Sequence, residues 1–373
     1  MPAVRFIHTA DLHLDTPFRG LSAMNPELAK RLKDATFESF RRIIDLCIER
    51  NADFLVISGD VFDSENKSLA AQLRFSSEIK RLSEKGISSY IACGNHDPYD
   101  TWLGAFRLPD NVHRFSTEKC ERFVYEKSGK VLADIHGISF REPSVKQNLA
   151  LKYNLPASPA PVSIAVLHGT VGPSGPHAEY APFSMDDIEG RGFDYWALGH
   201  IHKSRIVKQS NPAVVYPGNP QGRDFGETGL RGCYMVDIQK DIEPKMEFIS
   251  TQSIRLENIE IDLGGATHIE QIEEEIMKAL ERIRAEGNES SQIVRVYLRG
   301  RTSLHKQLFR QDEIQQLLEH LNEGQLAREC FTWIDSILAE TKPDIDVDTI
   351  RGGAGFTAEI LKAVEAFSTD AEK

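Results

Sequence analysis

The chain has 373 residues, of which 40% are apolar and 27% charged, a composition that excludes a disordered or fibrous protein. At roughly 150 residues per domain, this length predicts two domains, or one large domain with an appended piece. The 44 Lys and Arg residues against 56 Asp and Glu residues give a net charge of −12. This balance argues against a protein that coats nucleic acid through bulk positive charge, but not against an enzyme with a local cationic site.

The cysteines and the N-terminus bear on where the protein works. The five cysteines are odd in number and scattered without a CxxC pair, so neither a disulfide framework nor a thiolate zinc site is expected. His8 and Asp11 interrupt the first apolar run, which is therefore too short for the apolar segment of a signal peptide. No later apolar run approaches membrane-spanning length. We therefore expect a cytoplasmic protein without a membrane partner.

Short apolar runs alternate with amphipathic helical stretches through the first half, which is typical of an α/β sandwich with strands packed between helices. The run at 54–58 is almost wholly apolar, as expected of a central strand buried on both faces. The stretch at 27–50 carries apolar residues at helical spacing. The predicted strands are 5–8, 54–58, 90–93, 162–167 and 195–198, and the predicted helices are 27–50 and 68–85.

A second set of elements follows a turn-rich run at 217–232. Residues 233–238 and 246–250 predict a closing hairpin, and a domain boundary is expected near residue 255. Beyond it, a strand, a helix and a strand form a compact β-α-β unit, at 259–263, 269–285 and 293–298. The remainder from about residue 311 reads as mostly helical and polar.

Each predicted strand of the first half ends in a short group of possible metal ligands. In an open α/β sheet the carboxyl ends of the strands share one edge, so these groups should converge on one crevice. Carboxylate, imidazole and amide oxygen without thiolate suit hard to intermediate divalent ions. One carboxylate that bridges two ions about 3.5 to 4 Å apart would use the whole set, and such a pair suits phosphate-ester hydrolysis. The groups are Asp11 and His13; Asp60 and Asp63; Asn95, His96 and Asp97; His168; and His200 and His202.

The motifs DxH, GDxxD, GNHD, a lone His before Gly, and GHxH stand in this order and resemble those of the calcineurin-like metallophosphoesterase superfamily. The segments HTADLHLD at 8–15 and GDVFD at 59–63 resemble more narrowly the SbcD-type DNA-repair exonucleases, in a divergent bacterial branch. The resemblance implies an α/β metallophosphoesterase β-sandwich flanked by helices as the catalytic domain. It also implies a small β-α-β capping domain that contacts DNA, and a helical C-terminal region. The expected bounds are 1–254, 255–310 and 311–373.

The resemblance also implies roles for the strand-end residues. It places Asp11, His13 and His202 on a first metal ion, Asn95, His168 and His200 on a second, and Asp60 between the two. His96 would donate a proton to the departing oxygen or stabilise its charge, and Asp63 would orient that imidazole. The expected cofactor is two divalent ions, Mn²⁺ first, with Fe²⁺, Mg²⁺ or Zn²⁺ as alternatives.

The function predicted from this resemblance is a metal-dependent DNA phosphodiesterase of DNA repair, an exonuclease or endonuclease. The alternative keeps the metal pair but takes a nucleotide, lipid or phosphoprotein substrate. Family members work with an SMC-like coiled-coil ATPase, which would be a separate protein here, and a homodimer is expected on the same ground. A DNA-bridging scaffold without catalysis fits less well, because the ligand set is intact.

Other residues have simpler interpretations. His8 and His136 lie in strand-like runs, where we expect hydrogen-bonded core side chains. Arg223, in the glycine-rich run after the last ligand group, could touch a phosphate, but a structural role in the loop is favoured. Arg295, Arg299 and Arg301 form a basic cluster that could bind the DNA backbone without reading sequence.

Overall fold

The computed structural model describes residues 3–18, 25–63, 68–102, 107–154, 160–172, 180–286, 290–344, 347–353 and 355–370. The chain forms two compact units. The first comprises Met1–Glu257, Gly287–Ile293 and Leu326–Phe331, and the second comprises Asn258–Glu286, Val294–Gln325 and Thr332–Lys373. No helix among the described residues is long and apolar enough to cross a membrane.

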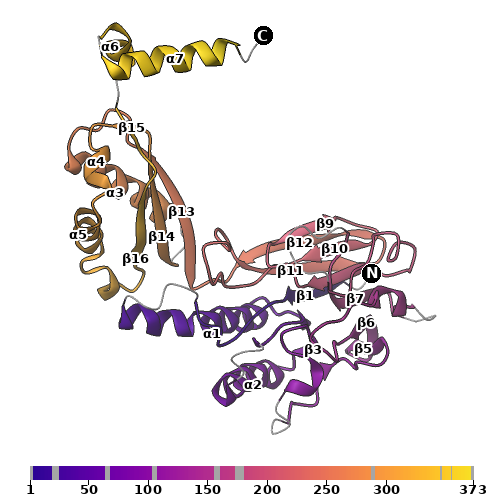
Figure 1. Cartoon of the computed structure of the whole chain (residues 1–373). Coiled ribbons are helices and arrows are strands. Elements are labelled where there is room, and N and C mark those ends of the chain that lie inside the picture. Colours follow the sequence, from indigo (N-terminus) through magenta and orange to yellow (C-terminus); the bar gives the residue numbers. More distant parts are fainter. Residues whose placement is uncertain are drawn as a thin grey trace. The chain divides into compact units, whose positions relative to one another are not determined.

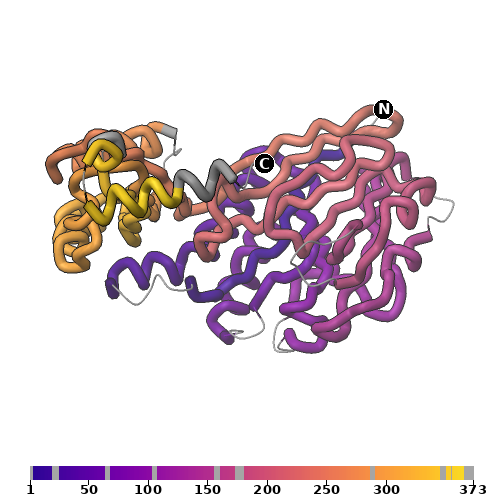
Figure 2. The backbone as a smooth tube through the Cα atoms, turned by 45° about the horizontal axis from the view of Figure 1, so that its top comes forward, coloured from indigo at the N-terminus to yellow at the C-terminus, as the bar shows by residue number. Residues whose placement is uncertain are grey.

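The first sheet of the first unit has the strand order β12-β11-β1-β2-β3-β4 (Figure 1). Strands β1 to β4 are parallel, and β11 joins β1 in antiparallel register, so the closing hairpin lies beside the N-terminal strand (Figure 2). The bounds are β1 Val4–Thr9, β2 Phe54–Ser58, β3 Ser88–Ala92, β4 Val112–Arg114, β11 Gly232–Gln239 and β12 Ile242–Ser250.

The second sheet has the order β5-β6-β7-β8-β10-β9, with β6, β7, β8 and β10 parallel. Its bounds are β5 Glu121–Lys127, β6 Lys130–Ile138, β7 Val162–His168, β8 Tyr195–Gly199, β9 Arg205–Lys208 and β10 Ala213–Tyr216. Short 3₁₀ turns, η1 Tyr99–Thr101 and η2 Leu149–Lys152, lie in the connections.

Strand β2 shows why the two sheets stack into a sandwich. Its side chains alternate between the two faces of the sheet. Phe54 and Val56 join an apolar cluster that also contains Ile164 of the second sheet, whereas Leu55 and Ile57 join a cluster with the helices. Every residue of β2 is buried, as the apolar run predicts. The α/β sandwich predicted from the sequence is confirmed.

Two helices cover the outer face of the first sheet, α1 Pro26–Glu49 and α2 Leu69–Glu84. Helix α1 begins where the sequence provides a cap. The Asn25 side chain accepts hydrogen bonds from the backbone N–H groups of Glu27 and Leu28, and Pro26 occupies the first turn. Helix α2 begins in the same way, with the Ser68 hydroxyl accepting from the Ala71 N–H.

The second unit is built on the three-stranded sheet β13-β14-β16 with helices α3 and α5 packed against it. Its elements are β13 Ile254–Asp262, α3 Ile269–Glu286, β14 Ser291–Arg299, β15 Arg301–Thr302, α4 His305–Leu308, α5 Gln311–Asn322, η3 Gln325–Ala327, β16 Thr332–Ala339, β17 Lys342–Pro343, α6 Val347–Gly352 and α7 Phe356–Asp370.

Strand β16 corrects the expectation of a mostly helical region after residue 311. Its apolar residues Trp333, Ile334, Ile337 and Leu338 recur at helical spacing, so the local pattern does not indicate a strand. The strand forms because β14 offers an edge with which it pairs. Ile334 and Ile337 then enter the apolar cluster of this unit.

The double-sided burial of β2 makes it sensitive to loss of side-chain volume. We predict that Leu55→Ala lowers the free energy of unfolding by about 2–5 kcal/mol, because a cavity remains in the core. Leu73→Ala on α2, where the leucine is 53% exposed, is the matched control. Urea denaturation followed by circular dichroism measures both. Equal effects of the two substitutions would contradict the burial argument.

Candidate metal centre

Five strands of the two sheets end at one place in the first unit. The loop after β1 runs along the loop after β2, with the Asp11 N–H donating to the Gly59 carbonyl at 3.0 Å and the His13 N–H to the Asp60 carbonyl at 3.1 Å. His168 ends β7, and the Gly169 N–H donates to the Gly199 carbonyl at the end of β8. The convergence predicted from parallel strand ends is therefore present.

The backbone at these strand ends is strained. Asp11, His13, Asp60 and His200 all have positive φ angles, of 53°, 43°, 52° and 98°. Residues other than glycine rarely adopt this region, and it persists only where the surroundings enforce it. All four belong to the predicted ligand set. Such strain is characteristic of functional sites, where it places side chains that a relaxed loop would direct elsewhere.

Glycines allow the strand ends to approach one another. A Cβ atom on Gly94 would lie 2.2 Å from the Asp60 Oδ1 atom, and one on Gly199 would lie 1.8 Å from the Ser58 carbonyl oxygen. Gly59 combines a φ of 96° with a position where a Cβ would lie 2.2 Å from the His168 ring. The absence of a side chain at these glycines is thus a steric requirement of the site.

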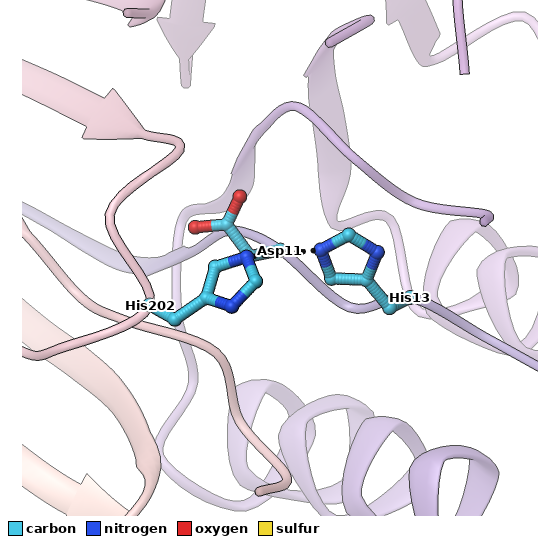
Figure 3. A group of neighbouring side chains, drawn as sticks. All are labelled: Asp11, His13 and His202. Atoms are coloured by element: carbon cyan, nitrogen blue, oxygen red, sulfur yellow. Dashed lines mark hydrogen bonds between the residues drawn. The ribbon is translucent and has the colours of Figure 1, made fainter. Parts of the chain in front are cut away.

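The first group of side chains consists of Asp11, His13 and His202, whose ligand atoms lie within 4.8 Å of one another (Figure 3). The Nε2 atoms of His13 and His202 are 3.2 Å apart. Asp11 is fully buried, and its carboxylate accepts the His200 N–H at 3.0 and 3.1 Å. Two imidazole nitrogens and a carboxylate oxygen at this separation could together hold one divalent ion.

The second group surrounds His168. Its Nε2 atom lies 2.9 Å from the Asn95 Oδ1 atom and 3.4 Å from the Asp60 Oδ2 atom. The ring of His200 is 5.3 Å from the ring of His168, centroid to centroid. Asp60 Oδ2 is also 3.9 Å from His13 Nε2, so this carboxylate lies between the two groups. That is the position a bridging ligand requires.

The tautomer of His168 provides a test of whether a metal fits. Its Nδ1 lies 2.9 Å from the Ser58 carbonyl, which can only accept, so Nδ1 carries the proton. In a neutral ring, Nε2 then presents a lone pair toward two oxygen acceptors, Asn95 Oδ1 and Asp60 Oδ2. The lone pairs on this nitrogen and on the two oxygens repel one another. A proton or a cation between the nitrogen and the oxygens relieves this repulsion. A ring oriented by its second nitrogen in this way is typical of metal-bound histidine, so the donor set fits a divalent ion.

Burial and mutual charge shift the proton affinities of the group. Burial disfavours the charged form of His168, but Asp60 and Asp11 outweigh it and raise the pKa of this ring to about 9. Burial would raise the pKa of Asp60, yet His168 and His13 hold that pKa below its ordinary value. Burial, followed by the charge of Arg223, lowers the pKa of His13 well below its ordinary value. His13 is therefore neutral at pH 7 and keeps a lone pair for a ligand.

His96 and Asp63 lie beside this cluster. The His96 Nδ1 atom is 3.5 Å from the Asp63 Oδ1 atom, and the His96 side chain is 38% exposed. Asp63 is the main cause that raises the pKa of His96. A partly exposed imidazole whose pKa is raised keeps its proton to higher pH and can donate it to a substrate. The ligand atoms of His13, Asp63 and His96 also lie within 4.8 Å of one another, so a third grouping is geometrically possible.

A glutamate that the sequence analysis did not single out contacts the first group. Glu227 accepts a hydrogen bond from His202 Nδ1 at 2.6 Å, and Arg223 lies 3.3 Å from the same carboxylate. The sequence feature that could have indicated Glu227 is its position, with Arg223, in a glycine-rich run soon after His202. Arg223 pairs with Glu227 of the same loop, a contact consistent with the structural role favoured for it. His8 is buried and hydrogen-bonded to Tyr195 and Ser58, as predicted, whereas His136 is buried with no hydrogen-bond partner for its Nε2 atom among the described residues.

Comparison with known proteins agrees with this geometry. Residues 4–204 match the family model of the calcineurin-like phosphoesterases, so the chain belongs to this family. Residues 257–342 match the model for the middle domain of the metallophosphoesterase YhaO. The chain is 35% identical over 345 residues to the metallophosphoesterase YhaO of Bacillus subtilis strain 168, and the match covers 92% of this chain and 84% of that protein. The resemblance stated from the motifs is confirmed.

More distant relatives are DNA double-strand break repair proteins. The chain is 25% identical over 304 residues to Mre11 of Methanopyrus kandleri, which covers 75% of this chain and 63% of that protein. It is 22% identical over 378 residues to Mre11 of Sulfolobus acidocaldarius, with 97% and 94% covered. A crystal structure of a dimetal phosphatase from Danio rerio matches 67% of this chain and 100% of its own, at 11% identity and a TM-score of 0.39, too low to carry an argument.

The steric fit at Gly94 can be tested through metal binding. We predict that Gly94→Ala weakens Mn²⁺ binding roughly tenfold or more, because the new methyl group displaces the Asp60 carboxylate. Gly352→Ala, where an added Cβ meets nothing within 4 Å, is the control. Isothermal titration calorimetry measures both variants. Wild-type affinity in Gly94→Ala would show that the carboxylate does not need its observed position.

Proposed function

We propose that this phosphoesterase is a cytoplasmic nuclease that hydrolyses phosphodiester bonds of DNA with two divalent ions, Mn²⁺ first among them. The observation that supports it most is the convergence of five strand ends on two groups of ligands joined by Asp60. In this proposal Asp11, His13 and His202 hold one ion, Asn95, His168 and His200 hold the other, and Asp60 contacts both. Two such ions would activate water and neutralise charge on the phosphoryl oxygens.

The protein's own residues supply the remaining steps. Asp63 stabilises the imidazolium form of His96, and the ring is partly exposed beside the ligand groups, where a phosphodiester would bind. His96 then donates the proton to the departing oxygen. Asp63 remains charged in this step and is itself held by the Thr16 hydroxyl at 3.1 Å.

DNA is proposed as the substrate because of the likeness to the Mre11 proteins, not because of surface charge. The predicted basic cluster in the second unit is largely compensated. Arg295 pairs with Asp335 at 2.8 Å, and Arg299 pairs with Glu260 at 2.6 Å and Glu340 at 3.0 Å. We propose that this unit contacts the DNA backbone, but these pairs leave little free positive charge on its sheet.

The partner proposals concern an SMC-like coiled-coil ATPase and a second copy of the chain. Helix α7 supports the first, because three apolar side chains at a spacing of four residues are exposed. Phe356 is 78% exposed, Ile360 45% and Val364 58%. Apolar residues at this spacing lie on one helical face and suit packing against another helix. The homodimer rests on the resemblance alone.

The substrate class is tested by comparing two phosphodiesters. We predict that the purified protein with Mn²⁺ cleaves a DNA duplex end or hairpin. His96→Ala should lower cleavage by about 10²–10⁴-fold, the usual contribution of a general acid, while two ions remain bound. Gel assays and metal analysis measure these outcomes. Robust hydrolysis of bis(p-nitrophenyl) phosphate with no cleavage of any DNA would instead favour a nucleotide, lipid or phosphoprotein substrate.

The pH dependence tests the role of Asp63. A general acid works only while protonated, so activity is retained below the pKa of His96 and lost above it. Asp63 raises that pKa. We therefore predict that Asp63→Asn moves the alkaline limb of the kcat/KM profile to lower pH. His96→Ala, which has no such group, should lack this limb. An alkaline limb that stays in place in Asp63→Asn would contradict the pairing.

A further inference from the structure

The turn-rich run after His202 folds around one buried carboxylate. The Glu227 side chain is 12% exposed and makes four contacts with three residues. Its Oε1 atom accepts from His202 Nδ1 at 2.6 Å and lies 3.3 Å from Arg223 Nη2. Its Oε2 atom accepts from Asn219 Nδ2 at 2.8 Å and from the Arg223 N–H at 2.9 Å. With both oxygens held by donors, from Asn219 and Arg223 of the loop and from His202, the carboxylate has one defined position next to the histidine ring.

This contact determines which nitrogen of His202 is available. The Arg223 Nη2 atom, which can only donate, also lies 3.2 Å from His202 Nδ1, but the Glu227 oxygen is closer, at 2.6 Å. Because a carboxylate can only accept, a contact this short requires the proton on Nδ1, and the Nε2 atom presents a lone pair. Nε2 is the atom that faces His13 Nε2 at 3.2 Å, in the first ligand group. We infer that Glu227 is a positioning residue that sets the tautomer and ring orientation of His202 for the first metal ion. This inference rests on the proposed function.

The same arrangement occurs in the second ligand group, where the Ser58 carbonyl accepts from His168 Nδ1 at 2.9 Å. Each group thus contains a histidine, His202 or His168, whose Nδ1 atom is held by an oxygen acceptor. His13 differs, because its Nδ1 atom is buried with no hydrogen-bond partner among the described residues. The contact of Glu227 is therefore specific to His202 and does not belong to every ring of the cluster. A charged acceptor also increases the basicity of the ligand nitrogen more than a carbonyl does.

Arg223 connects this support to the proton-donating pair. Its Nη2 atom lies 3.3 Å from Glu227 and its Nη1 atom 3.9 Å from the Asp63 Oδ2 atom. Its side chain is 14% exposed, so these charges interact with little solvent screening. One guanidinium thus lies between the carboxylate that orients His202 and the carboxylate that pairs with His96. Arg223 is a second positioning residue, which holds both carboxylates at the edge of the metal centre.

The test replaces the carboxylate with its neutral isostere. The Gln side chain in Glu227→Gln can present either an acceptor or a donor to His202, so the tautomer is no longer selected. We expect Mn²⁺ affinity at one of two sites to fall 10–100-fold, with the other site unchanged. Glu243→Gln, the same change at an exposed glutamate of β12, should leave both affinities at wild-type values. Calorimetric titration with Mn²⁺ and differential scanning calorimetry in EDTA provide these readouts.

A double-mutant cycle separates positioning from folding. If Glu227 acts through His202, adding Glu227→Gln to His202→Ala causes no further loss of affinity. Unchanged affinity at both sites in Glu227→Gln would overturn the inference while leaving the proposed function intact. A fall at both sites together with a lower metal-free melting temperature would show that Glu227 only holds the loop, and would also overturn it. A wild-type protein that binds no Mn²⁺ would overturn the proposed function and the inference together.

Discussion

The structure depends on the placement of two buried carboxylates, Asp11 and Asp60, where strands of both sheets end. Each is at most 1% exposed. Removing a charge from water is costly unless nearby partners compensate it. Part of the compensation comes from backbone N–H groups, since Asp11 accepts from His200 and Asp60 accepts from His96 at 2.8 Å. The rest has to come from a positive charge, a proton or a bound cation, because imidazole lone pairs that point at the carboxylates add repulsion.

The fold maintains this arrangement against local strain. Four of the strand-end residues have positive φ angles, and three glycines leave no room for a side chain. Asp97 helps to hold the loops in place, because its carboxylate accepts the Val61 N–H at 2.9 Å and the Gly94 N–H at 2.9 Å. It therefore ties the loop after β2 to the loop after β3. The two apolar layers on either side of the first sheet supply the stability that allows such strain at its edge.

The metal centre and the choice of substrate depend on different parts of the chain. The candidate ligand set would serve the hydrolysis of any phosphate ester, and its donor types do not distinguish DNA from a smaller phosphodiester. Arg295 and Arg299 are paired with carboxylates of the same unit, whereas Arg301 donates to the Pro343 carbonyl, so most of the positive charge of the predicted cluster is compensated. Recognition of DNA by this protein would then rely on the metal centre and on partners more than on the sheet of the second unit.

Much of the fold and of the candidate site could be predicted from sequence, because those signals are local. A strand buried on both faces is a short apolar run, as at 54–58, and a ligand group is two or three polar residues directly after such a run. The α/β sandwich, its central strands and the convergence of His13, Asp60 and His168 follow from these signals and from the geometry of parallel strands. Strand β16 could not be predicted, since its pairing with β14 overrides a helical spacing of apolar residues.

Only the tertiary structure decided the contacts that join distant or irregular segments. The link from Glu227 to His202 spans a run of turns, in which no periodic pattern indicates where a side chain points. The pairing of Arg299 with Glu260 and Glu340 depends on which strands are neighbours, and it turned an apparent basic cluster into compensated charge. The sequence thus determined which groups the strand ends carry. The folded chain decided how each group is oriented and neutralised, because orientation and charge pairing depend on neighbours far along the chain.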